Sequence, residues 1–173
     1  MQKNNSPTAY RKELRERILA ASMEEFRKHG VRAVKMDDIA SRLGISKRTL
    51  YEIYSNKETL LLEGMKMYEE DIDAYMTRFV ESDEHNVIET IIEFYNLQIK
   101  QSANINPLYF EELHRYPSVL AFFEQKHKDR RLKQKLFFKR GVNEGCFRDD
   151  VDYDIFGRIC DSSMEYVMRT QMY

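Results

Sequence analysis

The stretch MDDIASRLGISKRTLYEIY, residues 36–54, has the pattern of two short helices joined by a tight turn. Apolar residues recur at helical spacing, at positions 36, 39, 40, 43, 45, 50 and 54. Gly44 permits the tight turn, Ile45 fills the angle between the helices, and Ser46 is a suitable N-cap for the second helix. These features predict a helix-turn-helix.

The second helix of this motif is expected from Lys47 to Ile53 or Tyr54, and its polar side chains point outward. Those outward residues are Lys47, Arg48, Thr49, Tyr51 and Glu52. A recognition helix enters the DNA major groove with its N-terminal residues near base edges, where Arg bonds guanine and Glu accepts from cytosine. The alternative is a two-helix corner inside an ordinary bundle, because short patterns of this kind also occur by chance.

Helical patterns continue on both sides of the motif, and the alternating pattern of a strand is absent from the sequence. Helices are expected at residues 10–29, 36–43, 47–53 or 54, 57–80, 86–103, 107–115, 117–141 or 145, and from 152 to the end. A capping box between Ser55 and Glu58 is expected to start the helix at 57. The predicted fold class is therefore all-α.

Composition narrows the class of protein further. With 42% hydrophobic and 33% charged residues in 173, the chain is a globular protein rather than a disordered one. Apolar runs are far shorter than the ~20 residues of a membrane span, and the N-terminus does not resemble a secretory signal. Cys146 and Cys160 are too few for a disulfide scaffold, so a cytoplasmic location is expected.

Charge is distributed unevenly along this nearly neutral chain. Residues 1–60 carry 13 Lys and Arg against 8 Asp and Glu, while the remaining residues carry 15 against 21. A basic N-terminal third favours an anionic partner such as nucleic acid or an anionic membrane surface, although such a split is also common by chance.

Many residues around the motif match one protein family in order, in spacing and without a gap. They are Ile18-Leu19-Ala20-Ala21, Phe26, Gly30, Asp38-Ile39-Ala40, Leu43-Gly44-Ile45-Ser46-Lys47, Thr49-Leu50-Tyr51, Tyr54, and Lys57-Glu58 with Leu60. This stretch, from Arg17 to Leu60, resembles the N-terminal domain of TetR-family transcriptional regulators. The resemblance covers about a quarter of the chain and favours a DNA-binding regulator.

The resemblance implies a ligand-responsive repressor, not an enzyme, that binds a palindromic operator in double-stranded DNA as a homodimer. A three-helix N-terminal head would bind DNA, and the C-terminal helical core would hold a small-molecule effector and the dimer contact. The expected division is a flexible arm at 1–9, a helix-turn-helix domain at 10–56 and a ligand-binding and dimerisation domain at 57–173. We expect neither a cofactor nor a metal.

DNA contacts are expected at six positions. By resemblance Lys47, Thr49, Tyr51 and Lys57 touch DNA, with Lys57 on a phosphate, while Tyr54 packs the head together. Arg48 is expected to read a base from the exposed face. Lys35 is a candidate phosphate contact.

The chain departs from the family pattern at several of these positions. Val34 and Lys35 stand where the family usually has Thr, so a side-chain cap of the first motif helix is missing. Arg48, Glu52 and Ile53 also replace common family residues, so the operator sequence does not follow by analogy.

The C-terminal core offers apolar and aromatic residues on helical faces, without a clear ligand signature. They are Met65, Tyr68, Ile72, Tyr75, Phe79, Ile91, Ile92, Phe94, Tyr95, Phe110, Leu113, Phe122 and Phe123. A subset would line a pocket, but plain core packing explains any one of them, so no effector-binding residue is assigned.

The last helix is apolar over a wide arc, with Ile155, Ile159 and Tyr166 on one stripe and Phe156, Cys160, Val167 and Met168 beside it. Such an arc needs two neighbours, which dimer pairing with the helix from Pro117 would supply. Family members usually have one more helix in the dimer bundle, so a final helix is expected to be missing here.

Three alternatives from other classes are weaker. Glu111 with His114 and Glu124 with His127 have the spacing of carboxylate-bridged metal sites, but the second pair lies in a densely charged, solvated segment. A basic head on a membrane surface explains the charge but not the turn at Gly44. Cys146, next to Gly145, permits redox sensing without an evident activating partner.

Overall fold

The computed structural model describes residues 7–82 and 84–170, and within them it contains helices and no strand. The all-α prediction is therefore confirmed. The helices are α1 (Pro7–His29), α2 (Met36–Leu43), α3 (Lys47–Ile53), α4 (Lys57–Glu81), α5 (Val87–Ser102), α6 (Pro107–Leu113), α7 (Pro117–Asn143) and α8 (Tyr153–Thr170).

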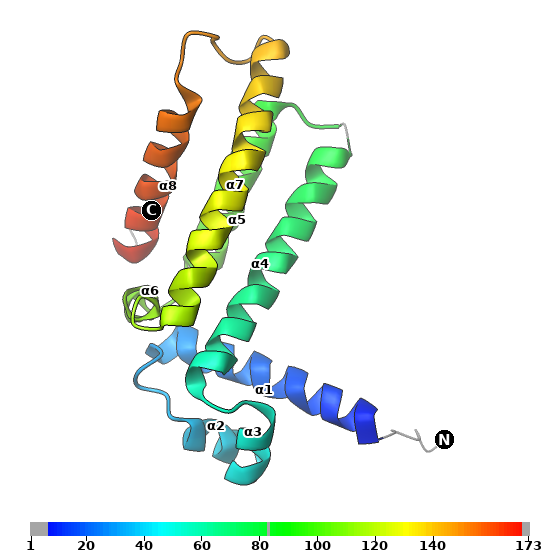
Figure 1. The fold of residues 1–173 in the computed structure, drawn as a ribbon, viewed down its shortest axis with the longest axis vertical. Helices are drawn as coiled ribbons and strands as arrows, with labels where there is room; N and C mark the ends of the chain where they lie inside the picture. The colour runs from blue at the N-terminus through cyan, green and yellow to red at the C-terminus, as the bar shows by residue number, and fades with distance from the viewer. Residues whose placement is uncertain (1–6, 83, 171–173) are drawn as a thin grey trace.

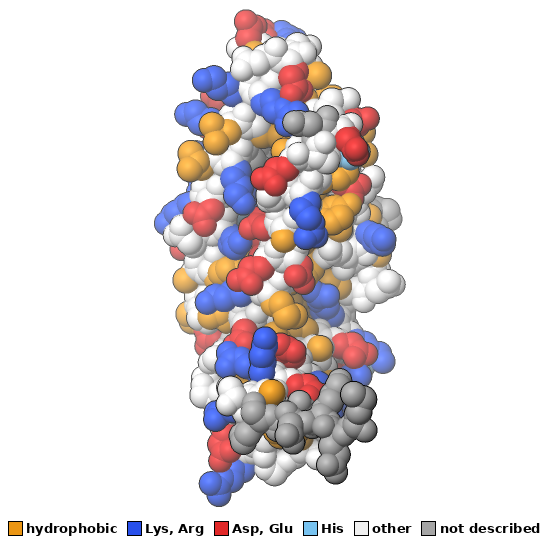
Figure 2. All heavy atoms as spheres, turned by 90° about the vertical axis from the view of Figure 1, so that its right-hand side faces the viewer, with side chains coloured by type: hydrophobic (Ala, Val, Ile, Leu, Met, Phe, Trp, Pro, Cys, Tyr) orange, Lys and Arg blue, Asp and Glu red, His pale blue; other side chains and the backbone are white. Residues whose placement is uncertain are grey.

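The helices form a small head below a long body (Figure 1). The head consists of α1, α2 and α3, and α1 lies across the lower end of the body. The body contains the long helices α4, α5, α7 and α8, with the short α6 beside the junction. The face displayed in Figure 2 carries basic and acidic side chains interspersed along the body rather than separated.

Local sequence signals explain where the two motif helices end. Gly44 has φ of +65°, the left-handed conformation that ends α2, and the N–H of Ile45 returns to the carbonyl of Ala40 at 3.0 Å. Ser46 caps α3, because its Oγ accepts the N–H of Thr49 at 3.0 Å. Both helices span the residues that the sequence predicts, apart from the alternative end at Tyr54.

One predicted helix start and one predicted N-cap are wrong. The helix α1 begins at Pro7 rather than Tyr10, since proline suits a first helical position, so residues 7–9 are helical. The rest of the expected flexible arm, residues 1–6, lies outside the described residues, as does the very end of the chain, residues 171–173. At α4 the capping residue is Asn56, whose Oδ1 accepts the N–H of Thr59 at 2.8 Å.

The expected capping box therefore does not form, because Glu58 has a better partner far along the chain. Its carboxylate accepts the backbone N–H of Ser118 at 2.8 Å and the Ser118 hydroxyl at 2.7 Å. Ser118 lies in the first turn of α7, where N–H groups lack partners within their own helix. One carboxylate thus ties the start of α4 to the start of α7.

One continuous cluster of buried apolar side chains runs through the head and into the body. Its members include Ile18, Phe26, Ile39, Leu50 and Tyr54 from the head, together with Leu60, Met65, Ile105, Tyr109, Leu113 and Val119. The head therefore shares its core with α4, α6 and α7. The domain boundary at residue 57 stays a prediction.

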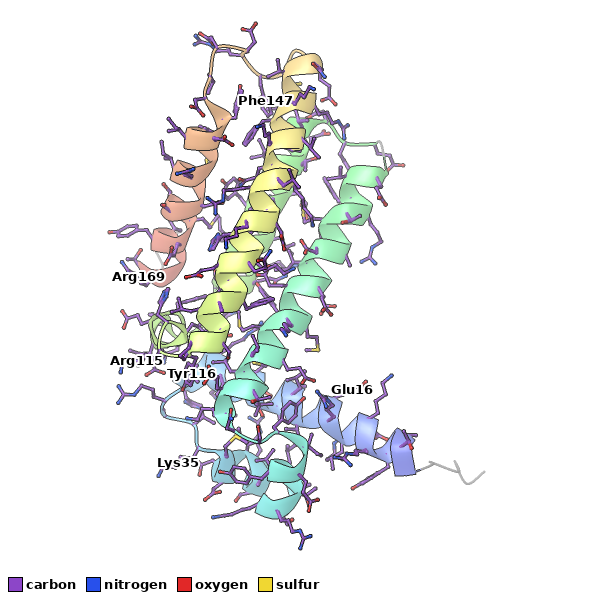
Figure 3. All side chains as sticks on the ribbon, viewed as in Figure 1. Glu16, Lys35, Arg115, Tyr116, Phe147 and Arg169 are labelled. Atoms are coloured by element: carbon purple, nitrogen blue, oxygen red, sulfur yellow. The ribbon has the colours of Figure 1, made fainter. Side chains whose placement is uncertain are left out.

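Close packing also fixes the far end of the body. A Cβ at Gly141 of α7 would clash with the ring of Phe147, which lies beyond the end of that helix (Figure 3). Phe138 stacks on Tyr153 at 4.7 Å between ring centroids, so α7 and α8 are held together there. Among the described helices, none is both long and apolar enough to cross a membrane.

Candidate nucleic-acid interface

The helix α3 presents one face to solvent because its other face is anchored in the head core. Leu50 is fully buried, and Tyr54, just beyond the helix, is 1% exposed. Residues at 47, 48 and 51 lie on the opposite side and are exposed. This arrangement is the one that the sequence predicts for a recognition helix.

Lys47 and Arg48 are exposed cations that already hold carboxylates. The Nζ of Lys47 bonds Asp37 of α2, and the Nε of Arg48 lies 2.8 Å from the Oε1 of Glu52 one turn later. A hydrogen bond to Asp37 raises the pKa of Lys47, and one to Glu52 raises the pKa of Arg48. Both side chains therefore stay charged and can exchange a carboxylate for a phosphate or a base edge.

Tyr51 and Thr49 differ in how freely they can reach a partner. The Tyr51 side chain is 46% exposed. Thr49 is half-buried, and its Oγ1 lies 2.8 Å from the Oγ of Ser46, so its hydroxyl takes part in the cap of α3. Of the two, Tyr51 is the side chain that projects beyond the helix.

Lys35 lies at the N-cap position of α2, at the outer edge of the head (Figure 3). Its side chain is exposed and makes no capping hydrogen bond. Its backbone N–H instead donates to the carboxylate of Asp38 at 3.1 Å. The side-chain cap is thus missing, as the sequence predicts, and the Lys35 side chain is exposed to solvent.

Lys57 is less exposed than the other cations predicted to contact DNA, which are Lys35, Lys47 and Arg48. Its side chain is half-buried, and its Nζ donates to the carbonyl of Val31 at 2.9 Å. Burial lowers the pKa of Lys57, although Glu112 and Asp38 oppose this effect. Lys57 therefore stabilises the loop between α1 and α2, and a phosphate would have to compete with that carbonyl.

Tyr54 is a core residue, as the sequence predicts, and it belongs to a small polar network between α1 and α4. Its hydroxyl donates to Glu63 at 3.1 Å, and Glu63 also accepts the Nε of Arg15 at 2.7 Å. The Arg15 guanidinium lies over the Tyr54 ring at 5.3 Å. Burial is the main cause that raises the pKa of Tyr54, so the hydroxyl remains a donor.

The head is joined to α6 by hydrogen bonds that sequence reasoning missed. The N–H of Asn106 donates to the carbonyl of Arg27 at 2.8 Å, near the end of α1. The carboxylate of Glu112 accepts the N–H of Arg32 at 2.7 Å in the loop that follows. These partners are about 80 residues apart in sequence, so local patterns carry no signal for them.

The residues of the proposed metal pair do not converge. His114 pairs with Glu165 at 3.7 Å, while Glu111, Glu124 and His127 are exposed. Within residues 7–82 and 84–170, no group of three or more His, Cys, Asp or Glu side chains is placed to hold a metal ion.

Comparisons with known proteins agree with the geometry of the head and the arrangement of the helices. The family model described as "Bacterial regulatory proteins, tetR family" matches residues 18–63, which contain the whole motif. Among curated proteins, the HTH-type transcriptional repressor KstR2 of Mycobacterium tuberculosis is 29% identical over 152 residues, which are 81% of this chain and 71% of that protein.

Solved structures share the fold at lower identity. A putative transcriptional regulator from Saccharomonospora viridis in complex with choline has a TM-score of 0.78 and 19% identity, covering 91% of this chain and 84% of that one. FadR of Thermus thermophilus, a transcriptional repressor in complex with lauroyl-CoA, has a TM-score of 0.59 and 21% identity, covering 90% and 81%.

Proposed function

This chain belongs to the TetR family of transcriptional regulators, and we propose from this that it represses transcription by binding a palindromic operator as a homodimer. Repression lasts until an effector bound in the body of the protein changes its affinity for the operator. The DNA contacts in this proposal come from Lys35, Lys47, Arg48, Thr49 and Tyr51. Lys57 is a further phosphate contact only if its ammonium leaves the Val31 carbonyl.

The exposed face of α3 is the observation that carries the proposal. Lys47 and Arg48 have side chains that are 66% and 88% exposed, at the N-terminal end that enters a major groove. Lys35, from the start of α2, lies on the same small head. A cation beside the groove suits a phosphate, and Arg48 suits a guanine edge.

An exposed apolar surface supports the dimer. Ile155, Ile159 and Tyr166 of α8 are 57%, 59% and 52% exposed, and they lie on one side of that helix. On the neighbouring α7, Leu132 and Leu136 are 67% and 65% exposed. Pairing this α7–α8 surface across a two-fold axis would bury it and place two heads about 34 Å apart, or at a multiple of one DNA turn.

The effector part of the proposal rests on the cavity in the body and on the relatives. Two proteins of the same fold bind choline and lauroyl-CoA respectively. An effector shifts DNA affinity only by binding one head spacing better than another, so it must bind the DNA-free and the DNA-bound dimer unequally. We place this action in the cytoplasm, with the DNA.

Selection of bound sequences from a random duplex pool tests the proposal. The purified full chain should enrich a consensus with two-fold symmetry, and sedimentation should show two chains per bound duplex. A consensus without symmetry would contradict the dimeric mode, and failure to retain any duplex would contradict DNA binding itself.

A further inference from the structure

A cavity of about 270 Å³ lies where the head meets the body, and six helices contribute to its wall. Most of the wall is apolar or aromatic, including Met65, Phe94, Phe110, Leu113 and Phe123. Liquid water would fill this volume with about nine molecules at roughly 30 Å³ each, so the cavity suits a small organic ligand.

Arg27 of α1 is the unusual member of this wall. Its guanidinium lies over the ring of Tyr68, with 4.7 Å between Cζ and the ring centroid. Its Nε is buried, and no described residue accepts a hydrogen bond from it. Nor does any described carboxylate form an ion pair with Arg27. Arg27 as a whole is half-buried, and a guanidinium partly withdrawn from water without an anion is costly, so a ligand that supplies the missing charge would stabilise it.

Apart from Asp161, the other charged groups of the wall are either paired with an opposite charge or exposed. Arg130 pairs with the buried Glu69 at 3.4 Å, and Lys126 pairs with Asp73 at 2.9 Å. Asp161 accepts the side-chain amide of Gln134 at 3.4 Å.

The remaining carboxylates of the wall, Glu124 and Glu165, are exposed, as is Arg169. Within the part of the chain that the structure describes, no carboxylate of the wall thus forms an ion pair with the half-buried Arg27.

The aromatic groups do not form a free cage for a cationic ligand. The Tyr68 ring already faces the guanidinium of Arg27, and the Phe94 ring faces that of Arg130 at 5.9 Å. A quaternary ammonium would meet cations where it needs open ring faces. The cavity therefore differs in its electrostatics from a choline-type site.

A second polar group is placed to orient a ligand. Gln98 of α5 is 7% exposed and lines the same cavity, and the structure records no hydrogen bond from its amide to a described residue. An amide can both donate and accept, so it suits the oxygen of a carboxylate or of a neighbouring carbonyl.

We propose that this cavity binds a small amphipathic monoanion, whose carboxylate pairs with Arg27 and whose short apolar chain packs against Met65, Phe94, Phe110 and Phe123. This inference rests on the proposed effector response, since it assigns the chemical class of the effector. Arg27 stands two residues before the end of α1, and its carbonyl accepts the N–H of Asn106. An anion bound there acts directly on the helix that supports the head.

Three probes with the same chain and different head groups test the ligand class: octanoate, 1-octanol and octyltrimethylammonium. Calorimetric titration of the full chain without DNA should show octanoate binding about tenfold or more tighter than the other two. Equal affinities, or tighter binding of the ammonium, would overturn the proposal. This comparison needs no variant, and it is independent of whether the protein binds DNA.

Two matched variants then test the residue. Arg27→Met should lower octanoate affinity to the octanol level, whereas Arg169→Met, which removes an exposed cation of the same wall, should leave the preference unchanged. Arg27→Lys should keep part of the preference, because it keeps the charge but not the planar geometry. Octanoate preference that survives Arg27→Met, or that disappears with Arg169→Met, would show that the anion binds elsewhere.

The duplex selection described above separates this inference from the proposed function. Octanoate binding without any duplex binding would contradict the regulator and leave the anion site standing. Duplex binding without octanoate preference would do the reverse. If both hold, octanoate should change operator affinity in the wild type and not in Arg27→Met.

Discussion

Arg48 is the arginine of α3, and its exposed guanidinium bonds Glu52 one turn later. We predict that Arg48→Ala costs about 1–3 kcal/mol of binding free energy at the selected operator and relaxes preference at one base position. The reason is that alanine cannot form the paired hydrogen bonds to a guanine edge. Competition between the operator and duplexes with single base changes measures both effects.

Arg115 supplies the control for charge alone. It is exposed at the turn between α6 and α7, away from α3 (Figure 3). Arg115→Ala should leave base preference unchanged. If Arg48→Ala also leaves preference and affinity unchanged, a different side chain of α3 reads the operator.

Lys57 and Lys35 form a matched pair for the second prediction. Lys57→Met should lower the free energy of unfolding by about 1–3 kcal/mol, because the Val31 carbonyl loses its donor in a partly buried place. Lys35→Met should leave stability unchanged and reduce the slope of log affinity against log salt by about one unit, since one phosphate contact is lost. Urea unfolding and salt titration of operator binding separate the two.

The opposite result would identify Lys57 as the phosphate contact. In that case Lys57→Met would flatten the salt slope by about one unit with little change in stability.

At the scale of the element, Glu58 makes acid stability testable. The hydrogen bonds from Ser118 lower the pKa of Glu58 below its ordinary 4.5. A carboxyl with a lowered pKa in the folded state stabilises the protein above that ordinary value, and the contribution is lost as the pH falls through the lowered one. Glu58→Gln should therefore lower the Tm at pH 7, and the difference from wild type should shrink towards pH 3.

Glu16→Gln is the matched control, because Glu16 lies on the exposed side of α1 (Figure 3). Its Tm should follow that of the wild type at both pH values. A Glu58→Gln deficit that stays constant with pH would mean that packing, not the charge, is lost.

Helix α8 carries the prediction about assembly. Ile159→Asp should convert the proposed dimer to a monomer at micromolar concentration, because it places a charge in the middle of the apolar α7–α8 surface. Sedimentation equilibrium measures the change. Tyr10→Asp, at an equally exposed apolar residue of α1, should leave the dimer intact. If Ile159→Asp and Tyr10→Asp sediment with the same molecular mass, the dimer uses another surface.

The sequence predicts an element well where its signals are local. Gly44 marks the end of α2 and Ser46 the start of α3, and both helices occur where the sequence predicts them. Glu58 shows the limit, because the capping box is reasonable locally but Ser118, 60 residues away, takes the carboxylate. Predictions that neglect distant partners fail most often at helix ends, because the unpaired N–H groups there can bond an acceptor from any part of the chain.

The candidate sites show the same limit. The exposed face of α3 follows from helical periodicity, so Lys47, Arg48 and Tyr51 were placed correctly on the surface. Lys57 could not be placed, since its partner Val31 lies in another segment. A signal for Arg27 was present: it continues the row Leu19 and Met23 at intervals of four, which puts a cation on a buried stripe.

At the scale of the whole molecule, buried tyrosine hydroxyls make the stability of the fold depend on pH in the alkaline range. Burial is the main cause that raises the pKa of Tyr68 to about 12 and that of Tyr109 to about 12. Above pH 10 the unfolded chain releases these protons first, so it holds fewer protons than the folded one and stability falls as the pH rises. Each phenol contributes at most about 1.4 kcal/mol per pH unit between 10 and 12.

Urea midpoints measured from pH 9 to pH 11.5 test this prediction. The wild type should lose stability more steeply than Tyr109→Phe, which has one buried phenol fewer. Parallel curves for the two proteins would show that Tyr109 ionises as easily in the folded chain as in the unfolded one.

The bond from Asn106 to the end of α1 has a consequence for synthesis. The side chain of Asn106 also donates to the carbonyl of Lys28, 78 residues earlier. At about 5–20 residues per second, a ribosome needs about 4–16 s to make the chain between them. During that time the nascent head lacks α6. The cluster that contains both Phe26 and Tyr109 is therefore still incomplete. The newborn first helices are thus the part of this protein that chaperones and proteases meet first.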